Sequence, residues 1–491
     1  MLPSDYPENH GLSSRALYDL FGQIEQRELH LNSFMLLQDG KVTAEFWREL
    51  YRKEIPQLLY SLSKSFTSIA VGIAWDKGLL DLDDPVILYF PDKMPDVVSP
   101  KLARMKIRHL LSMTAGHDYN IYAAVEAEQD WAAAFLAQEV ALEPGTHYLY
   151  STHSTYMLSA IIERVTGQSL VDFLMPSLFE PLSIPRPEWE TCPLGVTAGG
   201  MGLSLTTESV AKFGLMLLDN GIYEGKRIVS ERYLALATAE QSDNRMANAG
   251  KIDSMQGYGY QFHMCRRGCY RGDGSFGQMC FVAPKEKIVI AMTASFRSMR
   301  ELQIMLDLIY EHLLDRLEIE ETAISESEPK SLQHQLSRMT KLYLPSAHPL
   351  SSDPGIHLPN RRYSLSDNAH GLRELAFMEG ANERQTELQF IYRDSRRNKR
   401  LQFSFSKPFL SKSLFTKDLS DHEQTVIAYA TWETSHQLKL TLYYIETPYV
   451  VTYRLVFLDK TLELQFHINV SLNIPNFTAH GALIPQSFSV S

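Results

Sequence analysis

The chain has 491 residues, of which 44% are hydrophobic and 21% are charged, and its formal net charge is -11. This composition is that of an ordinary globular protein and excludes disorder as the main state, and the length favours two domains. The negative charge argues against a nucleic-acid partner, because neutralising phosphates requires clustered Lys and Arg side chains.

The cysteines and the N-terminal segment exclude further classes. Four cysteines are too few for a disulfide framework, and the chain has no Cys-x-x-Cys pair, so we expect no metal and no cofactor. The N-terminus lacks the basic and apolar regions of a signal peptide, and no run of about 18 apolar residues occurs. These features predict a cytoplasmic protein without a membrane partner.

The first part of the chain predicts a helix, then a hairpin, then several helices. Residues 13–29 have helical spacing, and residues 33–48 contain two β-rich runs around Asp39-Gly40, a strong hairpin signal. Residues 68–78 predict a helix that ends at Gly78. From about 80 to 200 the segments are helical, which predicts a helical subdomain.

Strand signals return after a helix that begins near Thr206 or Thr207. They occupy residues 258–265, 277–284 and 287–295, and a final amphipathic helix follows over 299–317. Strands at both ends of this region imply that segments distant in sequence join one sheet. We therefore expect an α/β (α+β) domain over 1–316, an antiparallel sheet with flanking helices.

The remainder of the chain has a different pattern. Residues 317–355 are acidic and then rich in Pro and Ser, and predict a linker that can contain one helix. Residues 356–491 alternate with period two, as in 439–446, 450–458 and 461–470, which predicts an antiparallel β-barrel or sandwich. The basic run SRRNKR, 395–400, is expected to be a solvated hairpin tip.

Ser-x-x-Lys, the spacing of a serine nucleophile and its base, occurs four times in the chain. The matches are Ser61/Lys64, Ser209/Lys212, Ser327/Lys330 and Ser404/Lys407. A nucleophile needs a base within reach, a positive environment and a fixed exposed position, and the first turn of a helix supplies all three. Only Ser61 follows an extended run and precedes a helix. Ser209 lies within a predicted helix, Ser327 in the predicted linker and Ser404 in a predicted strand. The alternative for Ser61 is a capping serine beside a solvated lysine.

Two further stretches favour catalysis. EPGTHYLYSTHS places Tyr150 just before a predicted helix, and YRGDGSFGQMC is a glycine-dense loop entering a strand. With Ser61 and Lys64, this order resembles the serine β-lactamase and penicillin-binding-protein superfamily, and within it the bacterial class C β-lactamase- and esterase-like branch. The similarity covers roughly residues 10–315. It implies that Ser61 is the acyl-accepting nucleophile, Lys64 its proton-transfer partner and Tyr150 the second member of the general-base pair.

The sequence departs from that family in two places. Thr152 replaces the asparagine of the Tyr-x-Asn motif, so a hydroxyl stands where relatives have an amide. Because a hydroxyl can still hydrogen-bond, the resemblance implies that Thr152, like Arg271, Gly274 and Ser275, is a substrate-binding residue. The third motif of the family, Lys-Thr-Gly, has no literal match in this chain. Counting back six residues from Gly277, a spacing that the family often shows, puts Arg271 at the position of the motif's basic residue. The alternative is a register shifted by one residue, Gly272-Asp273-Gly274, which keeps the glycine and loses the charge. In either register, the similarity implies that backbone near Gly274 and Ser275 supplies one oxyanion N–H and that Ser61 supplies the other.

The C-terminal region more loosely resembles the lipocalin-like β domain of some members of this branch. Together the resemblances imply a metal-independent serine hydrolase that cleaves a carboxylic ester or amide, as an esterase, a β-lactamase relative or a D-amino peptidase does. A small molecule or short peptide would be the substrate, and homo-oligomerisation is left open. The alternative is an acyl-trapping or penicillin-binding sensor protein that does not turn over.

Overall fold

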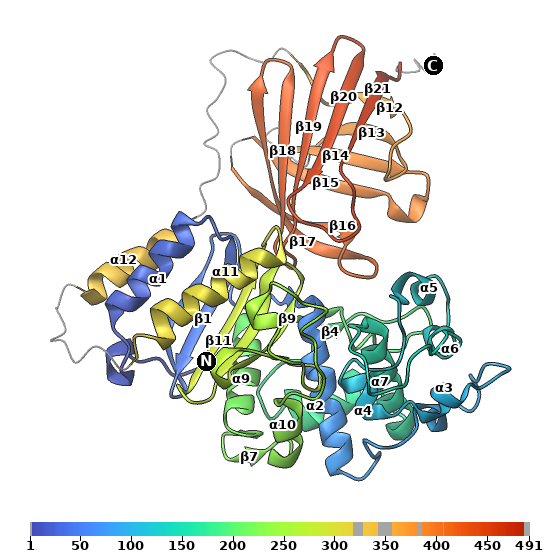
Figure 1. Cartoon of the computed structure of the whole chain (residues 1–491). Helices are drawn as coiled ribbons and strands as arrows, with labels where there is room; N and C mark the ends of the chain where they lie inside the picture. The colour runs from blue at the N-terminus through green and yellow to red at the C-terminus, as the bar shows by residue number, and fades with distance from the viewer. Residues whose placement is uncertain (1, 318–327, 342–355, 381–384, 406, 486–491) are drawn as a thin grey trace. The chain divides into compact units, whose positions relative to one another are not determined.

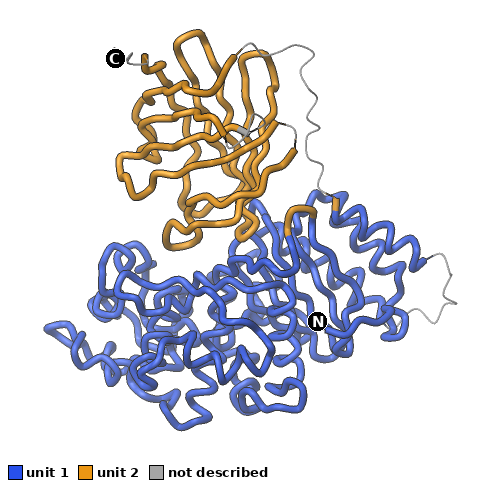
Figure 2. The backbone as a smooth tube through the Cα atoms, turned by 180° about the vertical axis from the view of Figure 1, so that it is seen from behind, with its two compact units in different colours: residues 1–48, 52–340 blue, residues 49–51, 341–491 orange. Residues whose placement is uncertain are grey.

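A computed structural model of the protein describes residues 2–317, 328–341, 356–380, 385–405 and 407–485. The chain divides into two compact units, residues 1–48 with 52–340 and residues 49–51 with 341–491 (Figure 2). None of the helices in these ranges combines the length and the apolarity that crossing a bilayer requires.

The first unit is built on a six-stranded sheet in the order β2-β1-β11-β10-β9-β8. Figure 1 labels its strands β1, β11 and β9. Its strands are β1 (Leu31–Gln38), β2 (Lys41–Trp47), β8 (His263–Met264), β9 (Tyr270–Gly274), β10 (Gln278–Ala283) and β11 (Ile288–Ala294). The two ends of the unit's sequence meet where β1 pairs antiparallel with β11, with Phe34 opposite Met292. The prediction that distant strands join one sheet is confirmed.

The hairpin between β1 and β2 turns at the predicted Asp39-Gly40. Both residues have positive φ, 47° and 77°, as the tight hairpin turn that matches strand twist requires. All eight residues of β1 are buried, because helices cover both faces of the sheet.

Helices of the first unit cover the two faces of the six-stranded sheet. Those outside the helical subdomain are α1 (Ser14–Gln26), α2 (Ser63–Asp76), α9 (Thr207–Leu218), α10 (Glu231–Ala237), α11 (Met299–Ile309) and α12 (Glu328–Thr340). Side chains of α1, α11 and α12 share one core with alternate residues of the strands. On the opposite face α9 lies so close that a Cβ on Gly214 would be 2.4 Å from Val289.

The helical subdomain packs around α7 (Thr152–Thr166). Its other helices are α3 (Pro100–Arg104), α4 (Ile107–Leu111), α5 (Tyr122–Glu126), α6 (Trp131–Leu136) and α8 (Leu170–Leu174). Ser151 caps α7 by accepting a hydrogen bond from the Ser154 N–H, and Gly167 ends the helix with φ 68°. Because α7 also packs on α2, the segment that carries Tyr150 is held beside the helix that follows Ser61.

The short strands form two small sheets. One consists of β3 (Gln57–Leu58), β4 (Glu188–Trp189) and β5 (Leu203–Leu205), and the other of β6 (Ile222–Tyr223) and β7 (Lys226–Arg227). The pairing of β3 with β5 fixes the extended segment that leads into Ser61.

Two segments differ from the sequence expectation. Residues 258–265 form only the two-residue strand β8, because Gln261 has φ 66° and its amide donates to the carbonyls of Leu110 and Leu111, which breaks the strand. Within the expected linker, α12 packs on α1 in the core of the first unit. The rest of that linker, 318–327 and 342–355, lies outside the described residues.

The second unit is a ten-stranded antiparallel, nearly closed barrel in the order β15-β14-β13-β12-β21-β20-β19-β18-β17-β16. Its strands are β12 (Arg362–Leu365), β13 (Leu372–Glu379), β14 (Gln385–Tyr392), β15 (Lys399–Ser404), β16 (Phe409–Thr416), β17 (Asp421–Thr434), β18 (Gln437–Tyr444), β19 (Val450–Leu458), β20 (Thr461–Ile468) and β21 (Phe477–Leu483). The end strands β15 and β16 contact each other, which nearly closes the sheet. An α/β domain followed by an all-β barrel is thus confirmed; the similarity to lipocalins stays a prediction.

The basic run at 395–400 is only partly a solvated tip. Arg396, Arg397 and Arg400 are exposed, but Lys399 is buried at the start of β15. Because successive side chains of a strand point to opposite faces, the side chain of Lys399 points into the barrel while that of Arg400 points outward.

Candidate active site

Ser61 and Lys64 lie where an extended segment becomes a helix. A single 3-10 turn, η2 (Tyr60–Leu62), carries Ser61 and runs directly into α2. Lys64 Nζ lies 3.0 Å from Ser61 Oγ and donates to the carbonyl oxygen of Gly200 at 2.7 Å. Lys64 is 1% exposed. The amine is therefore held beside the hydroxyl by a backbone group rather than by solvent.

Tyr150 completes a three-residue cluster with Ser61 and Lys64. Its hydroxyl shares a side-chain hydrogen bond with Ser61, and Lys64 Nζ lies 4.9 Å from the centroid of its ring. Burial raises the pKa of Tyr150 well above its ordinary value, although the bond to Ser61 lowers it. The phenol accordingly holds its proton at neutral pH.

The backbone on both sides of this cluster is strained. Tyr60, just before Ser61, has φ 50°, and Phe276, just after Ser275, has φ 64°. Left-handed backbone is costly for residues other than glycine and persists only where the surroundings enforce it. The two rings pack edge to face at 5.2 Å and hold the two turns against each other.

Strand β9 approaches Ser61 through a glycine. A Cβ on Gly274 would lie 2.1 Å from the carbonyl oxygen of Leu59 and 3.1 Å from the Ser61 nitrogen. Only glycine fits so close to another backbone segment. Gly274 and Ser275 therefore lie beside the N–H of Ser61, at the entry to a helix where N–H groups are free of helical partners.

A cavity of about 870 Å³ opens at Ser61 and Tyr150. Apolar side chains of Met299, Leu302, Ile304 and Leu306 form one wall, and residues 248–251 with Ser254 form another. Lys251 and Arg300 are exposed and also line the cavity. An acyl group with an apolar body fits such a wall.

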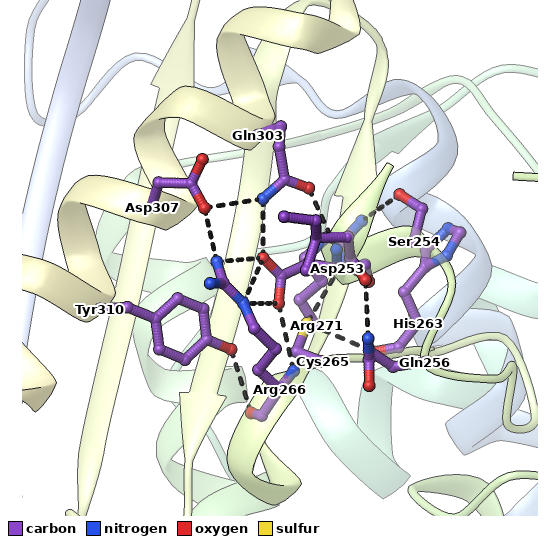
Figure 3. A network of polar contacts seen from close by, with 11 residues as sticks. Asp253, Ser254, Gln256, His263, Cys265, Arg266, Arg271, Gln303, Asp307 and Tyr310 are labelled. Atoms are coloured by element: carbon purple, nitrogen blue, oxygen red, sulfur yellow. Dashed lines mark hydrogen bonds and ion pairs between the residues drawn. The ribbon is translucent and has the colours of Figure 1, made fainter. Parts of the chain in front are cut away.

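Arg271 and Asp273 line the same cavity but are bonded to each other. Arg271 Nε donates to Asp273 Oδ2 at 2.6 Å. Arg271 Nη1 donates to the carbonyl oxygen of Asp253 at 2.9 Å (Figure 3). The Arg271 side chain is 2% exposed. Burial would raise the pKa of Asp273, but Arg271 and His263 bring it below its ordinary value. Most of the hydrogen-bond donors of Arg271 are therefore used within the protein rather than left for a substrate.

His263 connects this pair to Tyr150. Its ring lies parallel to that of Tyr150 at 6.3 Å, and its Nε2 lies 3.6 Å from Asp273 Oδ1. Burial lowers the pKa of His263 to about 4, so the imidazole is neutral near pH 7.

Asp253 anchors the wall of the cavity behind Arg271. Arg266 donates to both of its carboxylate oxygens, at 3.1 Å and 2.8 Å, and Gln303 Nε2 donates at 2.8 Å (Figure 3). Burial would raise the pKa of Asp253, but these bonds bring it below its ordinary value. The segment 248–254 is tied in this way to α11 and β9.

The structure places Thr152 apart from the cavity wall. Thr152 begins α7, and a Cβ on Gly200 would lie 2.9 Å from its Cγ2, so its methyl group faces Gly200. Thr152 is not among the described residues that line the cavity, whereas Arg271, Gly274 and Ser275 are. Recognition of substrate by Thr152 stays a prediction.

The other Ser-x-x-Lys pairs have ordinary roles where they are described. Ser209 donates its backbone N–H to the Thr206 cap of α9, and Lys212 pairs with Glu208. Ser404 is buried at the end of β15. Ser327 lies outside the described residues.

Several residues of the cavity escaped the sequence reasoning. They are Asn248, Lys251, Ser254, His263, Asp273, Met299, Arg300 and Gln303. His263 lies in a segment whose alternation indicates a strand, and nothing local distinguishes it. Among the described residues, no group of three or more His, Cys, Asp or Glu side chains is arranged to hold a metal ion.

Comparison with known proteins identifies the first unit. The family described as Beta-lactamase matches residues 33–314. The 6-aminohexanoate-dimer hydrolase of Paenarthrobacter ureafaciens is 26% identical over 302 residues, which are 57% of this chain and 77% of that protein. Penicillin-binding protein 4* of Bacillus subtilis (strain 168) is 31% identical over 133 residues, 25% of this chain and 28% of that protein.

Solved structures agree in fold. A proposed 6-aminohexanoate-dimer hydrolase from Bacillus anthracis aligns with a TM-score of 0.53 and 19% identity, over 66% of this chain and 89% of that one. The family match includes more than half of the chain and contains Ser61, Lys64, Tyr150 and Gly274. The chain belongs to the β-lactamase family of serine hydrolases.

Proposed function

We propose that this protein cleaves a carboxylic ester or amide, without a metal, through an acyl-enzyme on Ser61. The observation that carries the proposal is the position of the buried Lys64 Nζ, 3.0 Å from the Oγ of Ser61, which itself lines a partly apolar cavity. A serine hydroxyl becomes a nucleophile when a base lies within hydrogen-bond reach. The same spacing on an exposed helix face would have no such consequence.

The reaction would proceed in two steps. Ser61 Oγ attacks the carbonyl carbon while its proton passes to Lys64, directly or through the Tyr150 hydroxyl, and the carbonyl oxygen becomes an anion. That anion would be held by the N–H groups of Ser61 and Ser275. The C–O or C–N bond then breaks, and the leaving alcohol or amine takes the proton. Water attacks the acyl-serine in the same way and releases the acid.

Substrate size and polarity follow from the cavity. Its wall from α11 is apolar, and its volume of about 870 Å³ admits a substrate of moderate size. The related enzyme named 6-aminohexanoate-dimer hydrolase supports including linear amides among the candidates. Esters and amides with an unbranched acyl chain are therefore the first substrates to test.

The test combines covalent labelling with turnover. Wild type, Ser61→Ala and the matched control Ser209→Ala, which removes the serine of another Ser-x-x-Lys pair, are incubated with a fluorescent fluorophosphonate and with p-nitrophenyl butyrate. We expect labelling and turnover in wild type and in Ser209→Ala, and neither in Ser61→Ala. Labelling without turnover would instead support the acyl-trapping sensor. Absence of labelling in wild type would overturn both acyl-serine functions.

A further inference from the structure

The second unit has a cavity of its own, at one end of the barrel. Its volume is about 220 Å³, and its walls come from β14 to β17 and from the loops that contain 369–370 and 473–475. These loops all join strands at the same end of the barrel. Such a volume is large enough for a small aromatic or short-chain acid.

Lys399 lies in this cavity without a carboxylate partner. It is 9% exposed, and three rings surround its Nζ, with centroids at 4.8 Å for Phe415, 5.2 Å for Phe390 and 6.0 Å for Tyr392. No ion pair or hydrogen bond joins its side chain to the rest of the described chain. Burying a cation without an anion is costly, so natural proteins rarely retain one unless it has a use.

Another buried lysine of the barrel provides the contrast. Lys417 is 2% exposed and forms an ion pair with Glu446 at 3.1 Å. The barrel therefore neutralises a buried lysine at one position and leaves Lys399 open to the cavity at another. Burial lowers the pKa of Lys399, and the charge of Asp421 in the same cavity raises it, but Asp421 is bonded to Arg397 and Thr416. An anion in direct contact with Lys399 would therefore have to come from outside the described chain.

The other charged and titratable groups around the cavity balance one another. Arg397 Nε donates to Asp421 Oδ2 at 3.0 Å, and the Thr416 hydroxyl donates to Asp421 Oδ1 at 2.6 Å, so both carboxylate oxygens are occupied. Burial lowers the pKa of His370 to about 4, and the ring is neutral near pH 7. Burial lowers the pKa of Lys399 to about 7, so at mildly acidic pH the charge left for a ligand is the single positive charge of Lys399.

We propose that this end of the barrel binds one small monocarboxylate, whose carboxylate pairs with Lys399 and whose apolar body lies against Tyr392 and Phe415. The site is separate from Ser61 and does not depend on the proposed hydrolysis. A planar aromatic acid matches the cavity in charge, in size and in the two rings of its wall.

The test is calorimetric titration of the full chain with benzoate at mildly acidic pH, with benzamide as the neutral probe of the same shape. We expect one benzoate to bind per chain at a site that requires Lys399, and we expect benzamide not to bind at that site. Lys399→Met should weaken this binding at least about tenfold, the effect of losing a charge-assisted hydrogen bond. Lys399→Arg should retain most of it, and Lys412→Met, which removes an exposed lysine of β16, should leave it unchanged.

A second measurement uses only the wild-type chain, so it does not depend on how variants fold. Amine-reactive acetylation followed by mass spectrometry should modify Lys399, and benzoate should protect that residue but not Lys412. Three results would each overturn the site: no benzoate binding by wild type, equal binding by Lys399→Met, or binding of benzamide as tight as that of benzoate.

Discussion

The amine of Lys64 is anchored by the carbonyl oxygen of Gly200, 2.7 Å from Nζ, across 136 residues of sequence. This bond leaves the lysine facing Ser61 in one position, and the carbonyl keeps its place because Gly200 packs directly on the first turn of α7. A Cβ on Gly200 would lie 2.7 Å from the backbone oxygen of Thr152.

Gly200→Ala tests this anchoring. The added methyl must shift the backbone at residue 200, which moves the carbonyl that holds Lys64, and a displacement near 1 Å can cost about 100-fold in rate. We expect kcat for a p-nitrophenyl ester to fall by about that factor while KM changes little. Unchanged kcat in a folded Gly200→Ala chain would contradict the anchoring role.

Gly274→Ala tests the approach of β9 to the nucleophile. The new Cβ would meet the Leu59 carbonyl at 2.1 Å, so strand and turn must separate. We expect turnover to drop at least about 100-fold, the effect of losing an oxyanion donor. Gly272→Ala is the matched control, because its Cβ would meet the Ser65 and Leu62 side chains at 2.4 Å and 2.7 Å rather than backbone. A smaller loss in Gly274→Ala than in Gly272→Ala would contradict the assignment.

His263 is predicted to position Tyr150 by ring contact. His263→Ala removes the parallel ring, and we expect kcat to fall by about tenfold through a misplaced phenol while KM is retained. His263→Phe restores a flat ring without the imidazole nitrogens and should recover most of kcat. The measurement is kcat and KM of wild type, His263→Ala and His263→Phe. If His263→Phe does not restore kcat, the ring nitrogen near Asp273, rather than the ring contact, positions Tyr150.

Lys251 and Arg300 are predicted to favour substrates with an anionic end. Both are exposed at the cavity, and no ion pair joins either to a carboxylate of the described residues. In the double variant Lys251→Gln/Arg300→Gln we expect KM for p-nitrophenyl hydrogen glutarate to rise about threefold or more, with kcat unchanged, because exposed charge pairs contribute about 0.2–1 kcal/mol each. KM for the neutral p-nitrophenyl valerate should not move, and added salt should remove the difference. Equal effects on both esters would refute a charge-based preference.

Lys399 should make stability depend on pH in the alkaline range. Burial lowers its pKa from 10.5 to about 7. Between these values the unfolded chain binds a proton that the folded chain does not, so stability rises with pH across this interval. Lys399→Met removes the effect. We expect the variant to be more stable than wild type below about pH 7 and the difference to shrink as pH approaches 10.5.

Urea unfolding of both proteins at several pH values measures this difference. Lys412→Met, at a side chain that is 66% exposed, provides the control and should follow wild type throughout. A stability difference that is constant with pH would show that Lys399 does not titrate differently on folding.

Much of the nucleophile's setting could be predicted from the sequence. Ser61 and Lys64 are three residues apart at a helix start, and helical geometry alone brings such a pair to one face. Period-two alternation likewise determined the barrel as an all-β unit, because side-chain direction along a strand is a local property. These inferences needed no contact between distant segments.

The tertiary structure decided the surroundings of that pair. The anchoring of Lys64 by Gly200, the stacking of His263 on Tyr150 and the close approach of Gly274 to Leu59 each join segments far apart in the chain. Arg271 has the charge of a substrate-binding residue, yet its buried bonds to Asp273 and Asp253 occupy it. Local sequence sets which groups a segment carries, whereas packing sets which of them remain free to act, and only the folded chain brings those groups within hydrogen-bond distance.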